Sequence, residues 1–138
     1  MKALVQRVSS ARVLVESREI SAIGPGLLVL LGVAEGDGPE AADRLADKIR
    51  ALRIFDDAEG RMNEPLGERE VLCVSQFTLL ADTRKGNRPS YMAAAAPEVA
   101  EPLYERFRER LGAKGGVFGA RMAVELSNDG PVTLLLDA

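Results

Sequence analysis

The sequence contains no histidine and only one cysteine, Cys73. Without an imidazole, neither a serine nor a cysteine catalytic triad can be assembled, because each needs that ring as its base. A single cysteine cannot form an internal disulfide, which excludes a disulfide-stabilised secreted scaffold. A tetrahedral zinc site would lack its usual ligands, so we expect no metal and no cofactor. Any chemistry must use hydroxyls, carboxylates, amines, backbone groups or a group that the substrate brings.

Long hydrophobic runs and an excess of positive charge are also missing. No stretch reaches the roughly 18 apolar residues that a membrane span requires. The opening residues, MKALVQRVSSARVLVES, alternate with polar side chains instead of forming a signal-peptide core. We therefore expect a cytoplasmic protein with no membrane partner. A net charge of -3 argues against a protein that coats DNA or long RNA, although a small basic site is compatible with it.

The pattern along the chain indicates an α+β fold. The 138 residues, 46% of them hydrophobic, suit one domain spanning residues 1–138. Alternating or continuous apolar residues predict strands over residues 2–8, 11–16, 27–36, 71–81, 117–127 and 132–136. We expect the first two to form a hairpin through Ser9 and Ser10, and the third to be a central buried strand.

Two segments have helical periodicity. Apolar residues recur every three or four positions over residues 39–52, and Val99, Leu103, Phe107 and Leu111 are spaced by four within residues 97–111. Proline suits the first turn of a helix and Gly112 supplies a C-terminal stop for the second. Together, the predicted strands and helices indicate a mostly antiparallel, curled, barrel-like sheet with two main helices packed on it.

Cys73 and the polar segment that follows it are the first candidates for chemistry. No imidazole can activate Cys73, so it is better read as a small buried hydrophobe than as a nucleophile. Ser75, Gln76 and Thr78 then place polar side chains at the end of an apolar strand, where they must be satisfied or serve a ligand. The competing interpretation is that they are ordinary strand residues, and Thr78 lacks the adjacent base that a nucleophile needs.

A cationic loop comes directly after this segment. Arg84, Lys85 and Arg88 lie within five residues of one another and are interrupted by Gly86. Such a loop can hold one or two phosphates, because guanidinium and ammonium groups pair with phosphate oxygens. The alternative is a solvated turn without a ligand.

Near the end of the chain, SNDGPVT joins two apolar runs through Gly130 and Pro131. About one X-Pro bond in twenty is cis in folded proteins, and tight links between strands are where such bonds concentrate. Gly130 has no Cβ, so both backbone carbonyls could be presented bare to a closely approaching group. A simple turn is the competing interpretation.

Two motifs in order, SQFTLLADTRKGNRPSY at residues 75–91 and FGARMAVELSNDGPVTLLL at residues 118–136, closely resemble the D-aminoacyl-tRNA deacylases. The likeness extends to MKALVQRV, GLLVLLGV and ADKIRALRIFDD, and so covers essentially the whole chain. It implies a cytoplasmic homodimer that hydrolyses the ester between a D-amino acid and the terminal adenosine of tRNA.

The resemblance also implies roles for individual residues. Ser75, Gln76, Phe77 and Thr78 would line the pocket for the adenosine and the scissile ester. Gly130 and Pro131 would form a cis pair that enters the active site of the partner subunit. The remaining residues carried over are Phe118 and Met122 as an apolar wall, Arg7 as a brace for the Gly-Pro segment, and Arg84, Lys85, Arg88 and Asn128 as contacts of substrate or tRNA.

This family assignment predicts how mirror-image residues are told apart. With the amino group, Cα and carbonyl held fixed, L and D residues differ only in exchanging side chain and hydrogen. Two rigid carbonyls aimed at the L side-chain direction would reject L residues and admit D residues and glycine, including glycine mischarged on tRNA-Ala. The resemblance further suggests that the ribose 2′-OH assists hydrolysis, with Thr78 positioning the substrate.

Two other functions remain open from the residues alone. One is a non-catalytic module that binds RNA ends or nucleotides through the cationic loop and Phe77. The other is a protein-based threonine hydrolase of small esters or amides, which would cleave substrates without a 2′-OH.

Overall fold

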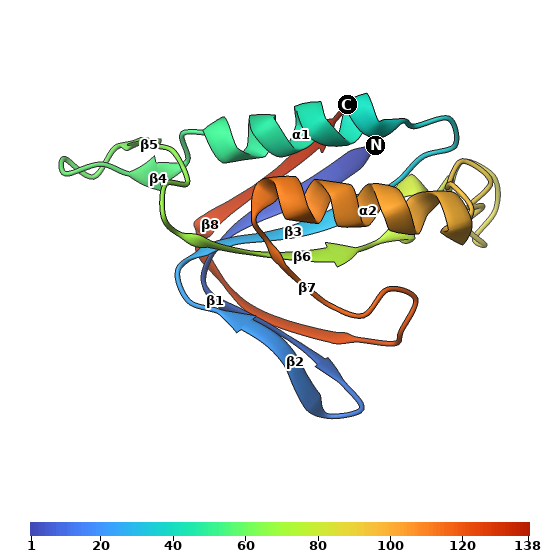
Figure 1. The fold of residues 1–138 in the computed structure, drawn as a ribbon, viewed down its shortest axis with the longest axis horizontal. Helices are drawn as coiled ribbons and strands as arrows, with labels where there is room; N and C mark the ends of the chain where they lie inside the picture. Colours follow the sequence, from blue (N-terminus) through green and yellow to red (C-terminus); the bar gives the residue numbers. More distant parts are fainter.

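A curled, barrel-like mixed sheet forms the centre of the computed structural model, which describes residues 1–138 (Figure 1). Its strands are β1 (Lys2–Val15), β2 (Arg18–Ile23), β3 (Gly26–Gly32), β6 (Glu70–Ser75), β7 (Lys114–Gly115) and β8 (Ala123–Asp137). β1 pairs antiparallel with three strands. β8 pairs with it along almost its whole length, whereas β3 pairs with its first half and β2 with its second half. β3, β6 and β7 are parallel neighbours. The predicted fold class is confirmed.

The first strand differs from its prediction. The expected hairpin at Ser9 and Ser10 is wrong, because β1 runs unbroken through both serines. The pairing of β1 with β8 is irregular at this point, and the irregularity changes which alternate residues face the helices. The hairpin turn lies at Glu16 and Ser17, whose φ angles of 50° and 64° suit the two-residue turn that follows the twist of paired strands.

Both helices lie on the same face of the sheet (Figure 1). α1 (Pro39–Ala51) and α2 (Pro97–Leu111) match the predicted segments closely, with proline in each first turn and Gly112 left-handed at the end of α2. Phe107 and Leu111 are fully buried against the sheet, whereas the predicted stripe residue Val99 is 48% exposed. None of the helices combines the length and apolarity that crossing a membrane demands.

The predicted strand over residues 71–81 is too long. β6 ends at Ser75, and the chain turns into a short 3₁₀ helix, η1 (Phe77–Leu80). The turn crosses the end of β3 so closely that a Cβ on Gly32 would lie 2.5 Å from Leu80 Cδ2. Leu80 is thereby buried, while Phe77 and Thr78 are exposed.

The predicted strands at residues 117–127 and 132–136 are also revised. Residues 117–120 form a turn, so Phe118 precedes the strand, and β8 then runs as one element from Ala123 to Asp137. Within it, residues 129–132 bulge away from the ladder, because Asn128 pairs with Val8 while Thr133 pairs with Gln6.

A two-stranded ribbon projects from the end of α1. It consists of β4 (Phe55–Asp56) and β5 (Met62–Glu64), and the Arg69 guanidinium lies 4.2 Å from the centre of the Phe55 ring. The ribbon matters for the site because the start of β4 lies beside Arg7.

Candidate active site

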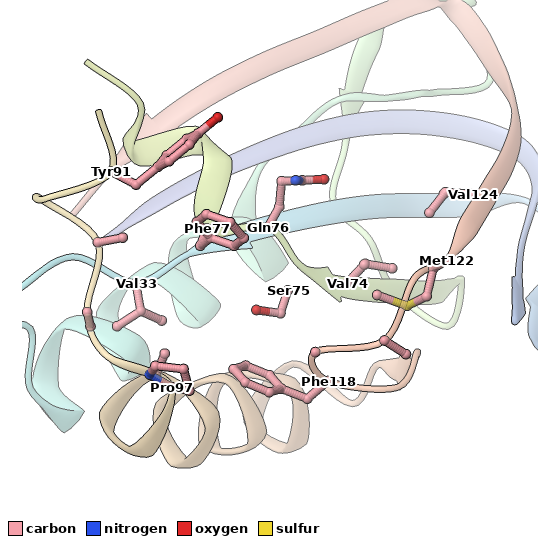
Figure 2. A pocket seen from close by; sticks show the side chains of 15 residues that line it. Val33, Val74, Ser75, Gln76, Phe77, Tyr91, Pro97, Phe118, Met122 and Val124 are labelled. Carbon is pink, nitrogen blue, oxygen red and sulfur yellow. The ribbon is translucent and has the colours of Figure 1, made fainter. Parts of the chain in front are cut away.

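A cavity of about 530 Å³ opens where β6 ends, beside the first turn of α2 and the turn that precedes β8 (Figure 2). Its volume is in the range of small-molecule sites. It is lined by Val33, Val74, Ser75, Gln76, Phe77, Tyr91, Ala94, Ala95, Pro97, Ala100, Phe118, Gly119, Ala120, Met122 and Val124. The lining contains no aspartate, glutamate, lysine or arginine.

The end of β6 supplies the polar part of the cavity. The Ser75 hydroxyl points toward its centre in Figure 2, with Val74 and Phe77 on either side. The backbone N–H of Gln76 donates to Leu31 O at 2.7 Å, which fixes the chain just where it leaves the sheet. A few polar groups among apolar walls orient a ligand more than they attract it.

Aromatic rings and a methionine form the apolar walls. Phe77 and Tyr91 are 54% and 38% exposed, and their rings meet edge to face with centroids 5.1 Å apart. Phe118 and Met122 extend into the cavity from the segment before β8 (Figure 2). Exposed aromatic faces beside a cavity are suited to stacking on a nucleobase.

Thr78 lies next to the cavity but is not part of its lining. It is exposed in η1, and its Oγ1 accepts a hydrogen bond from Gln76 Nε2. No carboxylate or amine is bonded to this hydroxyl, so nothing activates it as a nucleophile.

Cys73 lies two residues before the cavity and is fully buried. Desolvation raises the pKa of its thiol well above the usual range, so the reactive thiolate is disfavoured. Its backbone carbonyl accepts a hydrogen bond from the Tyr104 hydroxyl at 2.7 Å. These surroundings agree with the interpretation of Cys73 as a small core hydrophobe.

The cationic residues lie outside the cavity, beyond η1. The base of their loop is closed by two backbone hydrogen bonds between Asp82 and Ser90, of 2.8 and 2.9 Å. Arg84 pairs with Asp82 at 2.7 Å and, through that hydrogen bond, lowers the pKa of the Asp82 carboxyl. Lys85 and Arg88 are exposed and form no ion pair within the chain, so both charges are available to an anion.

The Gly130–Pro131 peptide bond is cis, and both residues are exposed in the bulge of β8. Neither residue lines the cavity of its own chain. The φ of Gly130 is +123°, and a Cβ added there would lie 2.9 Å from Arg7 Nη2. Only glycine fits this position without displacing its neighbours.

Arg7 joins this bulge to the β4–β5 ribbon. Its side chain is buried, with Nη1 donating to Ile54 O at 2.8 Å and Nε to Asp129 O at 3.2 Å. It also forms ion pairs with Asp56 and Asp129, at 3.5 and 3.3 Å. Arg7 therefore contacts the Gly-Pro segment directly, while Asn128 bonds to Thr133 and stays away from the cavity.

The residues named from the sequence thus fall into three places. Ser75, Gln76 and Phe77 share the cavity with Phe118 and Met122; Arg84, Lys85 and Arg88 form the outer loop; and Arg7, Asn128, Gly130 and Pro131 gather at the bulge of β8. Sequence reasoning missed Tyr91, although it ends the first motif. It also missed Pro97 and Ala100, for which helical spacing gave no functional signal.

The chain matches known proteins over its whole length. Residues 4–137 fit the family model described as D-Tyr-tRNA(Tyr) deacylase. The D-aminoacyl-tRNA deacylase of Opitutus terrae is 59% identical, with 100% of this chain and 97% of that protein covered. A solved structure of the c-Myc DNA Unwinding Element Binding Protein has 42% identity and a TM-score of 0.94, covering 100% of this chain and 99% of that one.

A more distant structure has the same fold. It is described as a probable eukaryotic D-amino acid tRNA deacylase, and at 20% identity it superposes with a TM-score of 0.82, covering 99% of this chain and 98% of that one. The curled sheet and the two covering helices are therefore a known fold. The chain belongs to the D-Tyr-tRNA(Tyr) deacylase family.

Proposed function

We propose that the chain hydrolyses the ester between a D-amino acid and the terminal adenosine of tRNA, releasing free tRNA and the amino acid. Membership of the family and the full-length similarity to D-aminoacyl-tRNA deacylases support this activity. A substrate of charged tRNA supports a cytoplasmic location.

The observation that carries the proposal is a cavity without any acidic or basic side chain in a chain without histidine. An aminoacyl ester is already reactive, and the adjacent ribose 2′-OH can activate or position the attacking water. The protein then contributes orientation and backbone N–H donors to the developing oxyanion. Each such donor is worth about 10²- to 10³-fold in other enzymes.

We propose that chirality is selected by Gly130 and Pro131 of a second copy of the chain. In one chain, this pair is exposed and lies outside the cavity, which supports a role in a partner's site. Leu126, Leu134 and Leu135 on the same strand are also exposed, an apolar surface suited to a homodimer contact. Backbone carbonyls placed where an L side chain would point reject L residues and admit a hydrogen.

The tRNA end is proposed to span the cavity and the cationic loop. The aromatic faces of Phe77 and Tyr91 suit the terminal base, and Lys85 and Arg88 suit backbone phosphates. Thr78, bonded to Gln76 at the rim, positions the ester without attacking it. In this arrangement the protein contacts only the acceptor end of the tRNA.

One assay tests the proposal against both rivals. Matched D-aminoacyl-, L-aminoacyl- and glycyl-tRNA, including glycine on tRNA-Ala, are offered to the enzyme. A D substrate with a terminal 2′-deoxyadenosine and its ester on the 3′ oxygen is offered as well. We expect rapid release of D residues and glycine, retention of L residues, and a strong loss of rate with the deoxy substrate.

The other outcomes identify the rivals. Binding of tRNA without release of any amino acid indicates a non-catalytic RNA-end module. Full activity on the 2′-deoxy substrate indicates a protein-based hydrolase. Release of D residues but not of glycine contradicts steric rejection, because glycine has a hydrogen in both directions.

A further inference from the structure

The bulge of β8 that carries Gly130 and Pro131 has a defined neck. Asn128 pairs with Val8 and Thr133 pairs with Gln6, so residues 129–132 stand opposite Arg7 alone. Backbone pairing therefore fixes both ends of the bulge but leaves residues 129–132 outside the ladder. Their position depends on whatever side-chain contacts cross the base.

A side-chain hydrogen bond closes that neck. Asn128 Nδ2 donates to Thr133 Oγ1 at 2.9 Å, directly across the base of the bulge. Gln6 Nε2 on β1 donates to the same oxygen at 3.3 Å and ties the pair to the sheet. Thr133 is β-branched, so its hydroxyl is held in few rotamers. We call Asn128 and Thr133 the neck pair.

The second anchor lies on only one limb. Arg7 Nε donates to Asp129 O, next to the neck, and none of its hydrogen bonds reaches Pro131 or Val132. The limb that returns from Pro131 to the sheet is held by the packing of Val132 on the main core and by the neck pair. Losing the neck bond loosens this limb, while Arg7 still holds the other.

Asn128 carries a further sign of a role beyond packing. Its Oδ1 is buried and accepts no hydrogen bond within the chain. Burying an acceptor without a partner is unfavourable, so an apolar residue would suit a purely structural position better. The same amide supplies, through Nδ2, the hydrogen bond across the neck.

We infer that Asn128 and Thr133 are positioning residues for chiral selection, setting how far the carbonyls of residues 130 and 131 protrude. The inference rests on the proposed function, since it assigns these residues to the proposed L-rejecting segment. It also revises the expectation that Asn128 contacts tRNA. Opening the neck lets the carbonyls recede, which makes room for an L side chain.

Thr133→Val tests this with a nearly isosteric change that removes only the hydroxyl. We expect hydrolysis of L-aminoacyl-tRNA to rise and the D-over-L preference to fall about five- to tenfold, the factor that one ordinary hydrogen bond represents. Asn128→Ala should act in the same direction. Thr133→Ser, which restores the hydroxyl, should recover most of the preference.

Gain of L hydrolysis is the decisive readout, because a folding defect lowers all rates and cannot create a new activity. Ser17→Ala, which removes an exposed hydroxyl without a hydrogen bond at the β1–β2 hairpin turn, is the control and should keep the wild-type preference. If Thr133→Val fails to fold, the same measurement on Asn128→Ala tests the inference, because that variant also removes the neck bond and keeps Thr133.

The two proposals fail in different ways. A wild type that prefers D residues, together with unchanged preference in folded Thr133→Val and Asn128→Ala, overturns the neck-pair inference alone. A wild type without any D-over-L preference refutes the proposed function and the neck-pair role with it.

Discussion

The two faces of the sheet differ in how much buried core one chain provides. On the face covered by α1 and α2, 22 buried residues form one core, and ion pairs of 2.8 Å join the helices through Arg106–Asp43 and Arg110–Asp47. The opposite face has a smaller core of 7 buried residues and carries the exposed leucines of β8, and the cavity is lined by residues of both faces. The helix-covered face has a complete core within one chain, whereas the proposed dimer contact would cover the exposed leucines of the opposite face.

Among the changes considered, Gly130→Ala should have the largest effect, and it acts on the less covered side of the molecule, at the bulge of β8. The new Cβ would lie 2.9 Å from Arg7 Nη2 at a φ of +123°, so the Gly-Pro segment must move. We expect the D-over-L preference, measured with matched aminoacyl-tRNAs, to fall about a hundredfold or more, as two lost interactions of ordinary strength would give.

The control is Gly60→Ala, because Gly60 also has a positive φ but a Cβ there meets nothing within 4 Å. It places an alanine at a positive φ outside the bulge. Wild-type rates and preference in Gly130→Ala would refute the steric gate.

Phe107→Ala tests the packing of the helix-covered face. Phe107 is fully buried in α2, and truncating such a side chain leaves a cavity in the core. We expect the free energy of unfolding, from urea denaturation, to fall by about 3–5 kcal/mol, with the D-over-L preference unchanged in the folded fraction. Val99→Ala on the half-exposed side of α2 should cost far less, and an equal loss would contradict the burial pattern.

Thr78→Ala separates positioning from nucleophilic attack. The hydroxyl is bonded only to Gln76, so its removal should lower kcat about tenfold, the factor of one hydrogen bond. Single-turnover hydrolysis of D-aminoacyl-tRNA measures this loss, with Ser17→Ala at the exposed β1–β2 hairpin turn as the control. Complete inactivity in a folded dimer, or a trapped acyl-Thr78 intermediate, would make Thr78 the nucleophile instead.

The salt dependence of tRNA binding measures how many phosphates the proposed site contacts. Lys85 and Arg88 carry free charges, and Arg84 shares its charge with Asp82, so we expect a shallow slope equivalent to about two to four phosphates. Lys85→Gln should reduce the slope by about one unit, while Lys48→Gln on α1 should not change it. A steep slope would indicate a much larger footprint.

Acidification should weaken the helix-covered face slightly. The hydrogen bond from Arg110, opposed by partial desolvation, lowers the pKa of Asp47 in the folded protein. Its stabilisation is therefore present above the ordinary aspartate pKa of about 4 and is lost as the pH falls through the lowered value. Asp47→Asn should be less stable than wild type at pH 7, and the difference should shrink toward pH 3.

Glu101→Gln is the control for this effect, because Glu101 is exposed and has no ion-pair partner. Urea denaturation at both pH values gives the comparison. A difference between wild type and Asp47→Asn that stays constant with pH would show that the ion pair with Arg110 is not its source.

How far the sequence predicted the fold depends on how local each signal is. Both helices follow from spacing and end signals within their own residues, and β3 follows from one continuous apolar run. The hairpin at Ser9 and Ser10 was wrong because their role is set by the bulge of β8, more than 100 residues away in the chain. The turn after Ser75 likewise depends on the close approach to Gly32.

In the site as well, local sequence signals were predictable and contacts between distant segments were not. The polar residues Ser75 and Gln76 stood out because they interrupt an apolar segment, and they do line the cavity. Pro97 and Ala100 gave no signal, since a helix start is required by the fold whether or not a ligand lies beside it. The bond between Asn128 and Thr133 exists only because β8 pairs with β1 on both sides of the bulge.

Much of the cavity wall is built from methyl groups. Ala94, Ala95, Ala100 and Ala120 each contribute a side chain of one carbon, so the available room is set by what these positions omit. Exchanging any of them for valine would add two carbons to the wall without touching a polar atom. We expect each such exchange to narrow the cavity by two methyl groups and to leave the bulge of β8 unchanged.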